Sequence, residues 1–418
     1  MKLGKESTKP QLSSPKGGGA IRGLGESFQP NEFTGTAGLS IPIPVSPSRG
    51  FELGFGIEYS SGSGNGVFGI GFGLPIPNVS RKTATGIPRY LGGDTDVFLL
   101  SNAEDLIPID GGTSDGKLLG ETYMVASYRQ RLEGLFAHIE HWKDAKTGDS
   151  DCRVVSKDNV TSLFGQSAGS RIADPDNPGH VCQWLLTEMF DAKGNRVVYE
   201  YKAKDGAGTG QAVYELKQVQ TAQKYIKRIC YGNTTPYAEA KGNGSEWLFE
   251  VVFDYGEHDL DVEKSNPYEM KKPWANRKDP FSTYHAGFEI RTHRLCRHIL
   301  MFHRFAELGP DPVLVHATRF HYHELPVLTQ LQSVESIGYR YENGKYQSQS
   351  LPPLEFTYTA FKPEQQPFKP LLSENGQPLP GLNLPPDYQL VDLYGEGIQG
   401  ILYSDGIRLY PPHSGFIG

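Results

Sequence analysis

The stretch FELGFGIEYSSGSGNGVFGIGFGLP, residues 51–75, contains the strongest strand pattern in the chain. Large apolar residues alternate with glycine or glutamate over 51–59, which is typical of a strand with one buried face. Apolar residues alternate with glycine over 68–74, which predicts a second strand with one apolar face and one bare face. Between these runs, Asn65 and Gly66 favour a tight hairpin turn with positive φ. The stretch therefore predicts a β-hairpin whose bare face packs against another sheet.

The same stretch contains the pattern G-x-G-x-x-G, from Gly64 to Gly69, which also occurs in nucleotide-binding loops. A dinucleotide site requires a helix that begins at the third glycine. Here glycines and prolines continue up to Pro77, and an α-helix does not tolerate them at that density. A second candidate, GGTSDGKL at 111–118, lacks the Ser or Thr that would hold magnesium after its lysine, and we interpret it as a surface turn. We expect no cofactor.

The rest of the chain has the same strand-rich character. Its 418 residues include 49 Gly and 30 Pro, and 11% of them are aromatic, which favours short strands and frequent turns. An apolar run at 294–308 is typical of a strand buried on both faces. Period-two alternation recurs at 197–201, 247–255 and 354–358. Turn-forming triplets separate these runs, at 193–195, 231–233 and 342–344. The predicted fold class is all-β, with extended antiparallel sheets.

Charge and cysteine content narrow the range of partners and compartments. The net charge of −7, without a basic stripe of interleaved aromatic residues, argues against a nucleic-acid partner. The N-terminal residues lack the apolar segment of a signal peptide, and no run of about 18 apolar residues could cross a membrane. The cysteines are predicted to be buried free thiols of a protein made in a reducing cytosol: Cys152, Cys182, Cys230 and Cys296.

Composition divides the chain into four parts. Residues 1–20 are polar and predict a flexible tail, and the strand-rich main domain follows over 21–361. The Pro-rich segment 362–386 predicts a linker between domains. Residues 387–418 contain two short strand-like runs, too few for a domain, so we expect the chain to stop inside its second module.

Single residues give only weak candidate sites. His321 and His323 would share one face of a strand, which is a metal-ligand geometry, but the charge of Arg319 on that face opposes a cation. Asp392 and Glu396 resemble half of a calcium loop that lacks a further carboxylate. No G-x-S-x-G nucleophile elbow is present. We expect no catalytic and no cofactor-binding residues.

Longer blocks resemble a known family. They include SPKGGGAIRGLGESF, VSRKTATGIPRY, YRQRLEGLFAHIEHW, LLTEMFDAKGNRVVYEYKAKD and FEIRTHRLCRHILMFH, which occur in order between Ser14 and Phe361. Together they are similar to the SpvB-type domain that begins the B components of bacterial insecticidal Tc toxins and also occurs in a Salmonella plasmid virulence protein. The block LVDLYGEGIQGILY, from Leu390 to Tyr403, resembles the repeat that opens the family's VCBS/FG-GAP-like β-propeller.

The resemblance implies a structural role. It implies curved β-sheets that form part of a hollow shell around a toxic polypeptide, closed together with an RHS-repeat C component. The propeller, of which this chain would hold the truncated first strands, would dock the shell onto the channel-forming A component. The resemblance also implies a protein that is made in the bacterial cytoplasm and secreted as part of a toxin complex without a classical signal peptide.

An alternative stays open at this point. The chain could be the delivery half of an SpvB-like ADP-ribosyltransferase whose catalytic domain lies outside it. Such catalytic domains need a Glu-x-Glu pair, and no two glutamates in this sequence are two positions apart. We therefore predict that the chain is not an enzyme. Because part of a shell leaves strand edges unpaired, we also expect the isolated chain to be poorly soluble or oligomeric.

Overall fold

A computed structural model describes residues 26–30, 35–49, 53–91, 96–101, 104–118, 121–132, 134–204, 222–237, 246–263, 266–359, 388–391, 400–404 and 409–410. The chain divides into two compact units, Met1–Thr357 and Tyr358–Gly418, and each is described by itself. The described residues form strands and short 3₁₀ segments, so the prediction of an all-β fold is confirmed. Among them, no helix has the length and apolar character needed to span a membrane.

The main unit begins with a small antiparallel sheet of order β1-β2-β3-β6. Its strands are β1 (Ser27–Pro30), β2 (Ala37–Pro42), β3 (Gly56–Ser60) and β6 (Phe72–Gly73). A two-residue ladder, β4 (Asn65–Gly66) with β5 (Gly69–Ile70), forms the glycine-rich loop between β3 and β6. In the described part of the first predicted strand, residues 53–59, regular strand begins at Gly56, and the second predicted strand is broken into the two short pieces β5 and β6.

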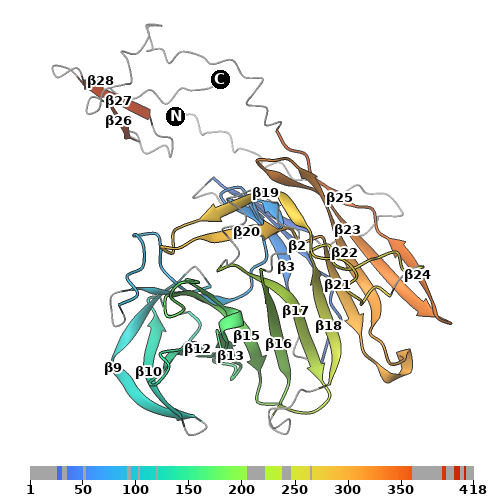
Figure 1. Cartoon of the computed structure of the whole chain (residues 1–418), viewed down its shortest axis with the longest axis horizontal. Helices are drawn as coiled ribbons and strands as arrows, with labels where there is room; N and C mark the ends of the chain where they lie inside the picture. The colour runs from blue at the N-terminus through green and yellow to red at the C-terminus, as the bar shows by residue number, and fades with distance from the viewer. Residues whose placement is uncertain are drawn as a thin grey trace, which may run out of the picture. The chain divides into compact units, whose positions relative to one another are not determined.

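The next strands belong to an antiparallel sheet system that closes on itself (Figure 1). The pairings locate the closure in eight strands, which we call the closed ring. They are β7 (Asn78–Arg81), β8 (Phe98–Leu100), β9 (Glu104–Leu118), β10 (Glu121–Gln130), β11 (His138–Asp144), β12 (Ser150–Val155), β13 (Thr161–Phe164) and β15 (Val181–Phe190). The 3₁₀ segment η2 (Ala168–Ser170) leads into β14 (Arg171–Ala173), which pairs with β15.

Strand β15 is where the sheet forks. Its residues 183–185 pair with β7 and complete the closed ring, whereas its residues 188–190 pair with β16. From β16 the sheet continues through strands that we call the open sheet (Figure 1). They are β16 (Arg196–Ala203), β17 (Lys224–Asn233), β18 (Trp247–Asp254), β21 (His298–His303), β22 (Val313–Glu324), β23 (Thr329–Glu342) and β24 (Lys345–Ser350).

Three smaller elements complete the main unit. The hairpin of β19 (Asn276–Thr283) and β20 (Ile290–Arg294) forms a separate two-stranded sheet. The 3₁₀ segment η3 (Ala306–Leu308) connects β21 to β22. Strand β25 (Leu354–Glu355) pairs with β23.

The closed ring fills its own interior. Trp184, fully buried, lies edge-on to Phe98 with ring centroids 5.6 Å apart and to His141 at 5.3 Å. The Arg81 guanidinium lies 5.0 Å from the centre of the Phe98 ring. Phe98, His141 and Trp184 come from three strands of the ring, β8, β11 and β15, that do not pair with one another, so their side chains meet across its interior.

The open sheet is covered on one face by the N-terminal segment. Phe68 lies edge-on to Phe320 of β22 at 5.3 Å, and Phe55 lies 6.2 Å from Phe253 of β18. The opposite face has its own apolar cluster, which includes Val252, Leu300 and Leu314 with partly buried side chains of residues 260–268. Strand β21 is buried at its four central residues, so the strand predicted at 294–308 is confirmed over 298–303, while Ala306–Leu308 forms the 3₁₀ segment η3.

The predicted turns have mixed outcomes. Gly194 and Gly344 have positive φ between strands, as the predictions at 193–195 and 342–344 require. The predicted turn at 231–233 is wrong, because Gly232, with φ +69°, lies inside β17 where a Cβ would approach Phe249 Cδ2 at 2.6 Å. The predicted surface turn at 111–118 is also wrong, because these residues continue the long strand β9, which pairs with β10 along most of its length.

The glycine-rich loop also differs from its prediction. The turn lies at residues 67–68 rather than at Asn65 and Gly66, and the positive φ values belong to Gly69 (+87°) and Gly71 (+77°). These glycines do not line a bare strand face. A Cβ on Gly69 would lie 3.0 Å from the Thr329 carbonyl oxygen, so β23 approaches the loop backbone closely.

In the second unit the structure describes one antiparallel sheet. It contains β26 (Tyr388–Val391), β27 (Gly400–Ser404) and β28 (Leu409–Tyr410). The predicted tail at 1–20 and linker at 362–386 lie outside the described residues. The assignment of 387–418 to a propeller stays a prediction.

Candidate functional site

The histidines predicted from the sequence lie on β22, and both are exposed. Glu335, on the neighbouring strand β23, lies 3.4 Å from His321 Nε2 and 3.4 Å from Arg319 Nη1. His321 is thus engaged in a surface ion-pair cluster with Glu335 and Arg319, while His323 stands opposite Gln330 in the register. The structure places His321 beside the carboxylate of Glu335, which the sequence did not indicate. It also places Arg319 beside the same carboxylate, and the sequence did indicate that positive charge.

The predicted calcium-loop residues, Asp392 and Glu396, lie outside the described residues. The four cysteines are free and buried, which confirms that part of their prediction. Cys152 and Cys296 are fully enclosed, and burial raises the pKa of both thiols well above its ordinary value, so neither is a reactive thiolate.

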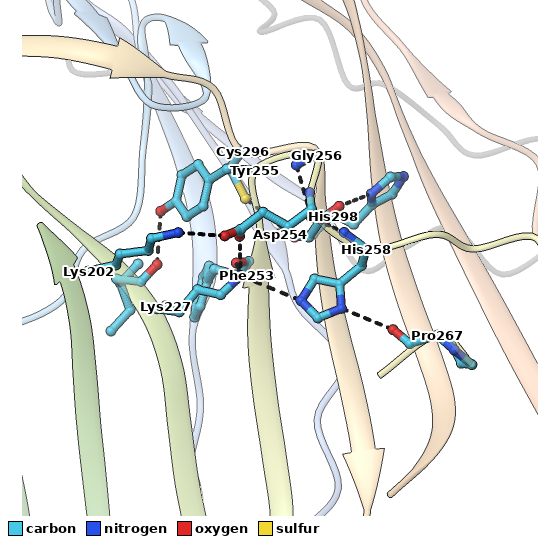
Figure 2. Close-up of polar contacts among 12 residues, drawn as sticks. Lys202, Lys227, Phe253, Asp254, Tyr255, Gly256, His258, Pro267, Cys296 and His298 are labelled. Atoms are coloured by element: carbon cyan, nitrogen blue, oxygen red, sulfur yellow. Dashed lines mark hydrogen bonds and ion pairs between the residues drawn. The ribbon is translucent and has the colours of Figure 1, made fainter. Parts of the chain in front are cut away.

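A different cluster emerges at the end of β18, where three potential metal ligands converge. Asp254, Glu257 and His258 are all buried, and one ligand atom from each lies within 4.8 Å of the others (Figure 2). They come from the short segment DYGEHD, residues 254–259, which begins at the last residue of β18. We call this group, together with Lys202, Lys227 and His298, the buried polar cluster.

Asp254 organises the turn itself. Its Oδ1 accepts hydrogen bonds from three successive backbone N–H groups, those of Gly256, Glu257 and His258, at 2.7–3.0 Å. Its Oδ2 accepts one from His298 Nδ1 on β21 at 2.7 Å. Burial alone would raise the pKa of Asp254, but the bonds and charge of His298 and the bond from His258 outweigh it, so the pKa lies below its ordinary value. The turn is fixed by one ionised carboxylate whose acceptor positions are filled.

A lysine contacts two of the three potential metal ligands, Glu257 and His258 (Figure 2). Lys227 Nζ donates to Glu257 Oε2, to the Phe253 carbonyl oxygen at 3.1 Å, and towards His258 Nε2 at 3.5 Å. His258 Nδ1 lies 3.0 Å from the Pro267 carbonyl oxygen, so it carries the proton and Nε2 is the acceptor. Burial and the charge of Lys227 lower the pKa of His258, which keeps the imidazole neutral.

The potential ligand atoms of Glu257 and Asp254 already accept hydrogen bonds from side chains of the protein. Glu257 Oε1 accepts a second hydrogen bond, from Lys202 Nζ at 2.8 Å, and that ammonium also lies 4.1 Å from the centre of the Trp274 ring. A divalent ion would have to displace Lys227 and share Glu257 with Lys202. The residues fit an internal ion-pair network that joins β16, β17, β18 and β21, and they do not fit a metal site.

A second buried ion pair fastens the glycine-rich loop. Arg277 and Asp279 of β19 have side chains exposed by 0% and 1%. Asp279 Oδ2 accepts hydrogen bonds from Asn65 Nδ2 at 2.8 Å and from the Thr329 N–H at 2.7 Å, while Arg277 Nη1 donates to the Gly66 carbonyl oxygen at 2.7 Å. This pair joins the loop at 65–66, the hairpin β19–β20 and strand β23. Sequence reasoning missed both clusters, although the three acid or imidazole side chains of DYGEH were a signal for the first.

The family of the chain follows from direct comparison. Residues 31–305 match the family model described as Salmonella virulence plasmid 65kDa B protein. The chain belongs to the SpvB family. Among curated proteins, the mono(ADP-ribosyl)transferase SpvB of Salmonella typhimurium strain 14028s is 34% identical over 341 residues, which are 78% of this chain and 56% of that protein. The chain thus spans about half the length of the curated SpvB relatives that it matches.

Several solved structures share the fold of this chain. The crystal structure of TcdB2-TccC3 is 35% identical with a TM-score of 0.80 and covers 96% of this chain, which spans 20% of that one. The N-terminal domain of the effector SpvB from Salmonella typhimurium strain LT2 is 34% identical with a TM-score of 0.67, over 72% of this chain and 98% of that domain. A Photorhabdus luminescens Tc holotoxin pore is 35% identical with a TM-score of 0.79, over 97% of this chain and 19% of that one. The predicted resemblance to the SpvB-type domain is confirmed.

Proposed function

We propose that this chain is a non-enzymatic structural module of a bacterial Tc-type toxin. It contributes curved β-sheet to the shell that encloses a toxic polypeptide, closed together with an RHS-repeat C component. The second unit is the beginning of the propeller through which the shell docks on the channel-forming A component. The protein acts outside the bacterium, as part of a secreted toxin complex.

The extent of the structural similarity carries this proposal. The TcdB2-TccC3 structure covers 96% of this chain with a TM-score of 0.80, whereas the SpvB N-terminal domain covers 72% with a TM-score of 0.67. The likeness to a Tc toxin component therefore extends over residues that the SpvB domain leaves unmatched. The full-length curated SpvB also matches only 78% of this chain, so this difference favours a Tc-type component over an SpvB-like transferase.

The chemistry of the described residues supports a structural role. The buried carboxylates in both ion clusters hold backbone N–H groups, lysines or arginines, so they fix turns and loops in place. Catalytic carboxylates must instead leave acceptor positions open towards a substrate. The sequence also lacks the Glu-x-Glu pair of the transferase domain.

The alternative, the delivery half of an SpvB-like ADP-ribosyltransferase, is supported by the 34% identity to the curated transferases. In that case the activity would reside outside the matched region. The two proposals predict different partners: an RHS-repeat polypeptide for the first, and a transferase domain on the same polypeptide for the second.

The decisive experiment uses the full-length protein that contains this chain. It is co-expressed with the RHS-repeat protein of the same genome, and the mixture is analysed by size-exclusion chromatography and limited proteolysis. The proposal expects a stoichiometric complex in which the toxic polypeptide resists protease until the complex is denatured. In parallel, the full-length protein is incubated with labelled NAD and a host-cell extract. Failure to form the complex, with transfer of label to a host protein, would establish the alternative.

A further inference from the structure

Charged and apolar side chains meet in a pocket of about 370 Å³ beside β17 and β18. This volume falls within the range of small-molecule sites, roughly 300–1,000 Å³. The charged residues that line the pocket are Arg228, Glu246, Glu250 and Arg304. Apolar surface comes from Trp247, Ala306 and Pro310. None of these residues belongs to the buried polar cluster or to the ion pair that fastens the glycine-rich loop, so the pocket is a separate candidate site.

One buried carboxylate holds both arginines of the pocket. The Glu250 side chain is 1% exposed, and its Oε1 lies 3.0 Å from Arg228 Nε. Its Oε2 accepts a hydrogen bond from Arg304 Nε at 2.8 Å. The Tyr268 hydroxyl donates to Glu250 Oε1 at 3.0 Å and accepts from Arg304 Nη2 at 2.7 Å. Within the described residues, the Nη nitrogens of Arg228 and the Nη1 of Arg304 have no hydrogen-bond acceptor, so these donors remain available to a ligand.

Glu246 adds an acceptor to these donors. It precedes β18, is exposed, and lines the same pocket. In the part of the chain that the structure describes, its carboxylate takes part in no hydrogen bond or ion pair. Its backbone is held in place, because its carbonyl oxygen accepts a hydrogen bond from the Thr234 N–H at 3.0 Å. The pocket therefore presents both donors and an acceptor that the fold itself does not use.

The charges of the pocket oppose an ionic ligand. The carboxylates of Glu246 and Glu250 balance the two guanidinium groups. Burial raises the pKa of the neighbouring Cys230 thiol to about 12, so it adds no charge. Glu200 Oε2, which lies 3.4 Å from Arg228 Nε, adds one more negative charge beside the pocket. An anion would therefore approach carboxylates, and a cation would approach two guanidinium groups. The pocket suits a neutral ligand that carries several hydrogen-bonding groups.

We propose that this pocket binds a neutral saccharide, an inference that does not depend on the proposed function. Sugar hydroxyl groups both donate and accept hydrogen bonds, so they accept from the two arginines and donate to Glu246. The C–H groups of a sugar ring are apolar and pack against the half-buried Trp247 side chain. A single monosaccharide unit in a pocket of this kind should bind with a dissociation constant of about 1 mM.

Saturation-transfer difference NMR tests the site in the full-length protein that contains this chain. The probes are the methyl glycosides of glucose, galactose, mannose and N-acetylglucosamine, each added singly near the expected dissociation constant. At least one of them should receive magnetisation from the protein, most strongly at the ring protons that pack against Trp247. Acetate or inorganic phosphate, added in excess, should not displace the sugar, because the pocket carries as many carboxylates as guanidinium groups.

A matched pair of substitutions locates the binding. Ala306 and Glu307 are both exposed residues of η3, but only Ala306 lines the pocket. Ala306→Gln extends a side chain into the pocket and should weaken binding about tenfold or more, whereas Glu307→Gln should bind as the wild type does. Neither residue takes part in the ion pairs around Glu250, so both variants should keep the wild-type melting temperature.

Glu246→Ala tests the acceptor without touching the buried carboxylate. The variant leaves a sugar hydroxyl without its charged acceptor and should weaken binding about tenfold, again with an unchanged melting temperature. The inference is wrong if none of the glycosides binds, if wild type and Ala306→Gln bind equally well, or if acetate or phosphate displaces the sugar. An oligosaccharide that ends in the bound sugar and binds at least as tightly would assign the site to a glycan chain. Binding of the glycoside alone would assign it to a free sugar.

Discussion

The closed ring and the open sheet differ in how their apolar faces are covered. Each is an antiparallel sheet with an apolar face that must be covered. The ring curls until its own strands cover that face, around Trp184 and Phe98. The open sheet takes its cover from the N-terminal segment on one face. On the other face the cover includes Leu260, Val262 and Tyr268, from the segment that follows β18.

Two of the buried charge clusters hold segments that cover the open sheet. Much of the covering segments lies outside regular strands. Their backbone N–H and C=O groups therefore need hydrogen-bond partners other than a neighbouring strand. The buried polar cluster fixes one of these segments at Asp254, and the Arg277–Asp279 pair fixes the other at Asn65. The ring interior contains aromatic stacking, with the guanidinium of Arg81 and the imidazole of His141 among the rings. Substitution of Asp279 in the cover of the open sheet should therefore change stability through electrostatics. Substitution of His141 in the ring should change stability through packing and protonation.

The largest effect is expected from Asp279→Ala. It leaves the Arg277 guanidinium buried without its carboxylate and removes the acceptor of Asn65 and Thr329. We expect a loss of about 3–5 kcal/mol in the free energy of unfolding, measured by urea denaturation. The matched control, Glu121→Ala, breaks an exposed pair with Lys146 and should cost less than about 0.5 kcal/mol. Equal losses for the two variants would mean that the buried pair does not fasten the open sheet's cover.

A pH-dependent effect is expected inside the ring. Burial, helped by the charge of Arg81, lowers the pKa of His141 to about 4, while the unfolded chain keeps the ordinary value near 6.5. As the pH falls from 6.5 to 4, the unfolded state binds a proton that the folded state does not, so stability falls with it. At pH 4 the loss from this residue reaches about 3 kcal/mol.

His141→Phe should remove that contribution, because phenylalanine suits the aromatic surroundings and does not titrate. The measurement is the unfolding free energy by urea at several pH values between 7 and 4. His316, on β22, has its pKa lowered to about 4 by burial as well, so part of the wild-type slope should persist in the variant. An equal slope in wild type and His141→Phe would contradict a buried neutral imidazole.

The smallest effect separates two glycines that look alike in the sequence. Gly71 has φ +77°, and a Cβ there would lie 2.4 Å from Tyr59 Cε2, whereas a Cβ on Gly73 meets nothing within 4 Å. Gly71→Ala should lower the free energy of unfolding by about 1–3 kcal/mol, and Gly73→Ala by less than about 0.5 kcal/mol. Thermal and urea unfolding of the two variants make the comparison. Similar losses would restore the sequence prediction of one bare strand face.

Much of the fold could be predicted because strand patterns are local. Alternation indicated β16, the apolar run at 294–308 indicated a strand buried on both faces that forms over 298–303, and the triplets at 193–195 and 342–344 are turns. Glycine misled the prediction at Gly232 and at 111–118. A glycine can serve a turn or a close approach inside a strand, and the neighbour that decides between them, such as Phe249 for Gly232, comes from another strand.

The candidate sites were harder to predict from the sequence than the strands were. The sequence showed His321 and the opposing charge of Arg319, but Glu335 reaches them only because β22 and β23 pair in a particular register. Asp254, Glu257 and His258 lie within five residues of the sequence and could have been considered as ligands. Lys227, which contacts Glu257 and His258, is placed beside them by the pairing of β17 with β18.

The sequence by itself determined the all-β class, most of the strands, the free buried thiols and the family, because each depends on local periodicity or on ordered blocks of residues. Only the tertiary structure decided that β15 forks, that one branch closes while the other stays open, and that lysine and arginine neutralise the buried acids. These features arise from pairings between residues far apart in the chain. Their free energy depends on which strands meet, and no local pattern contains that information.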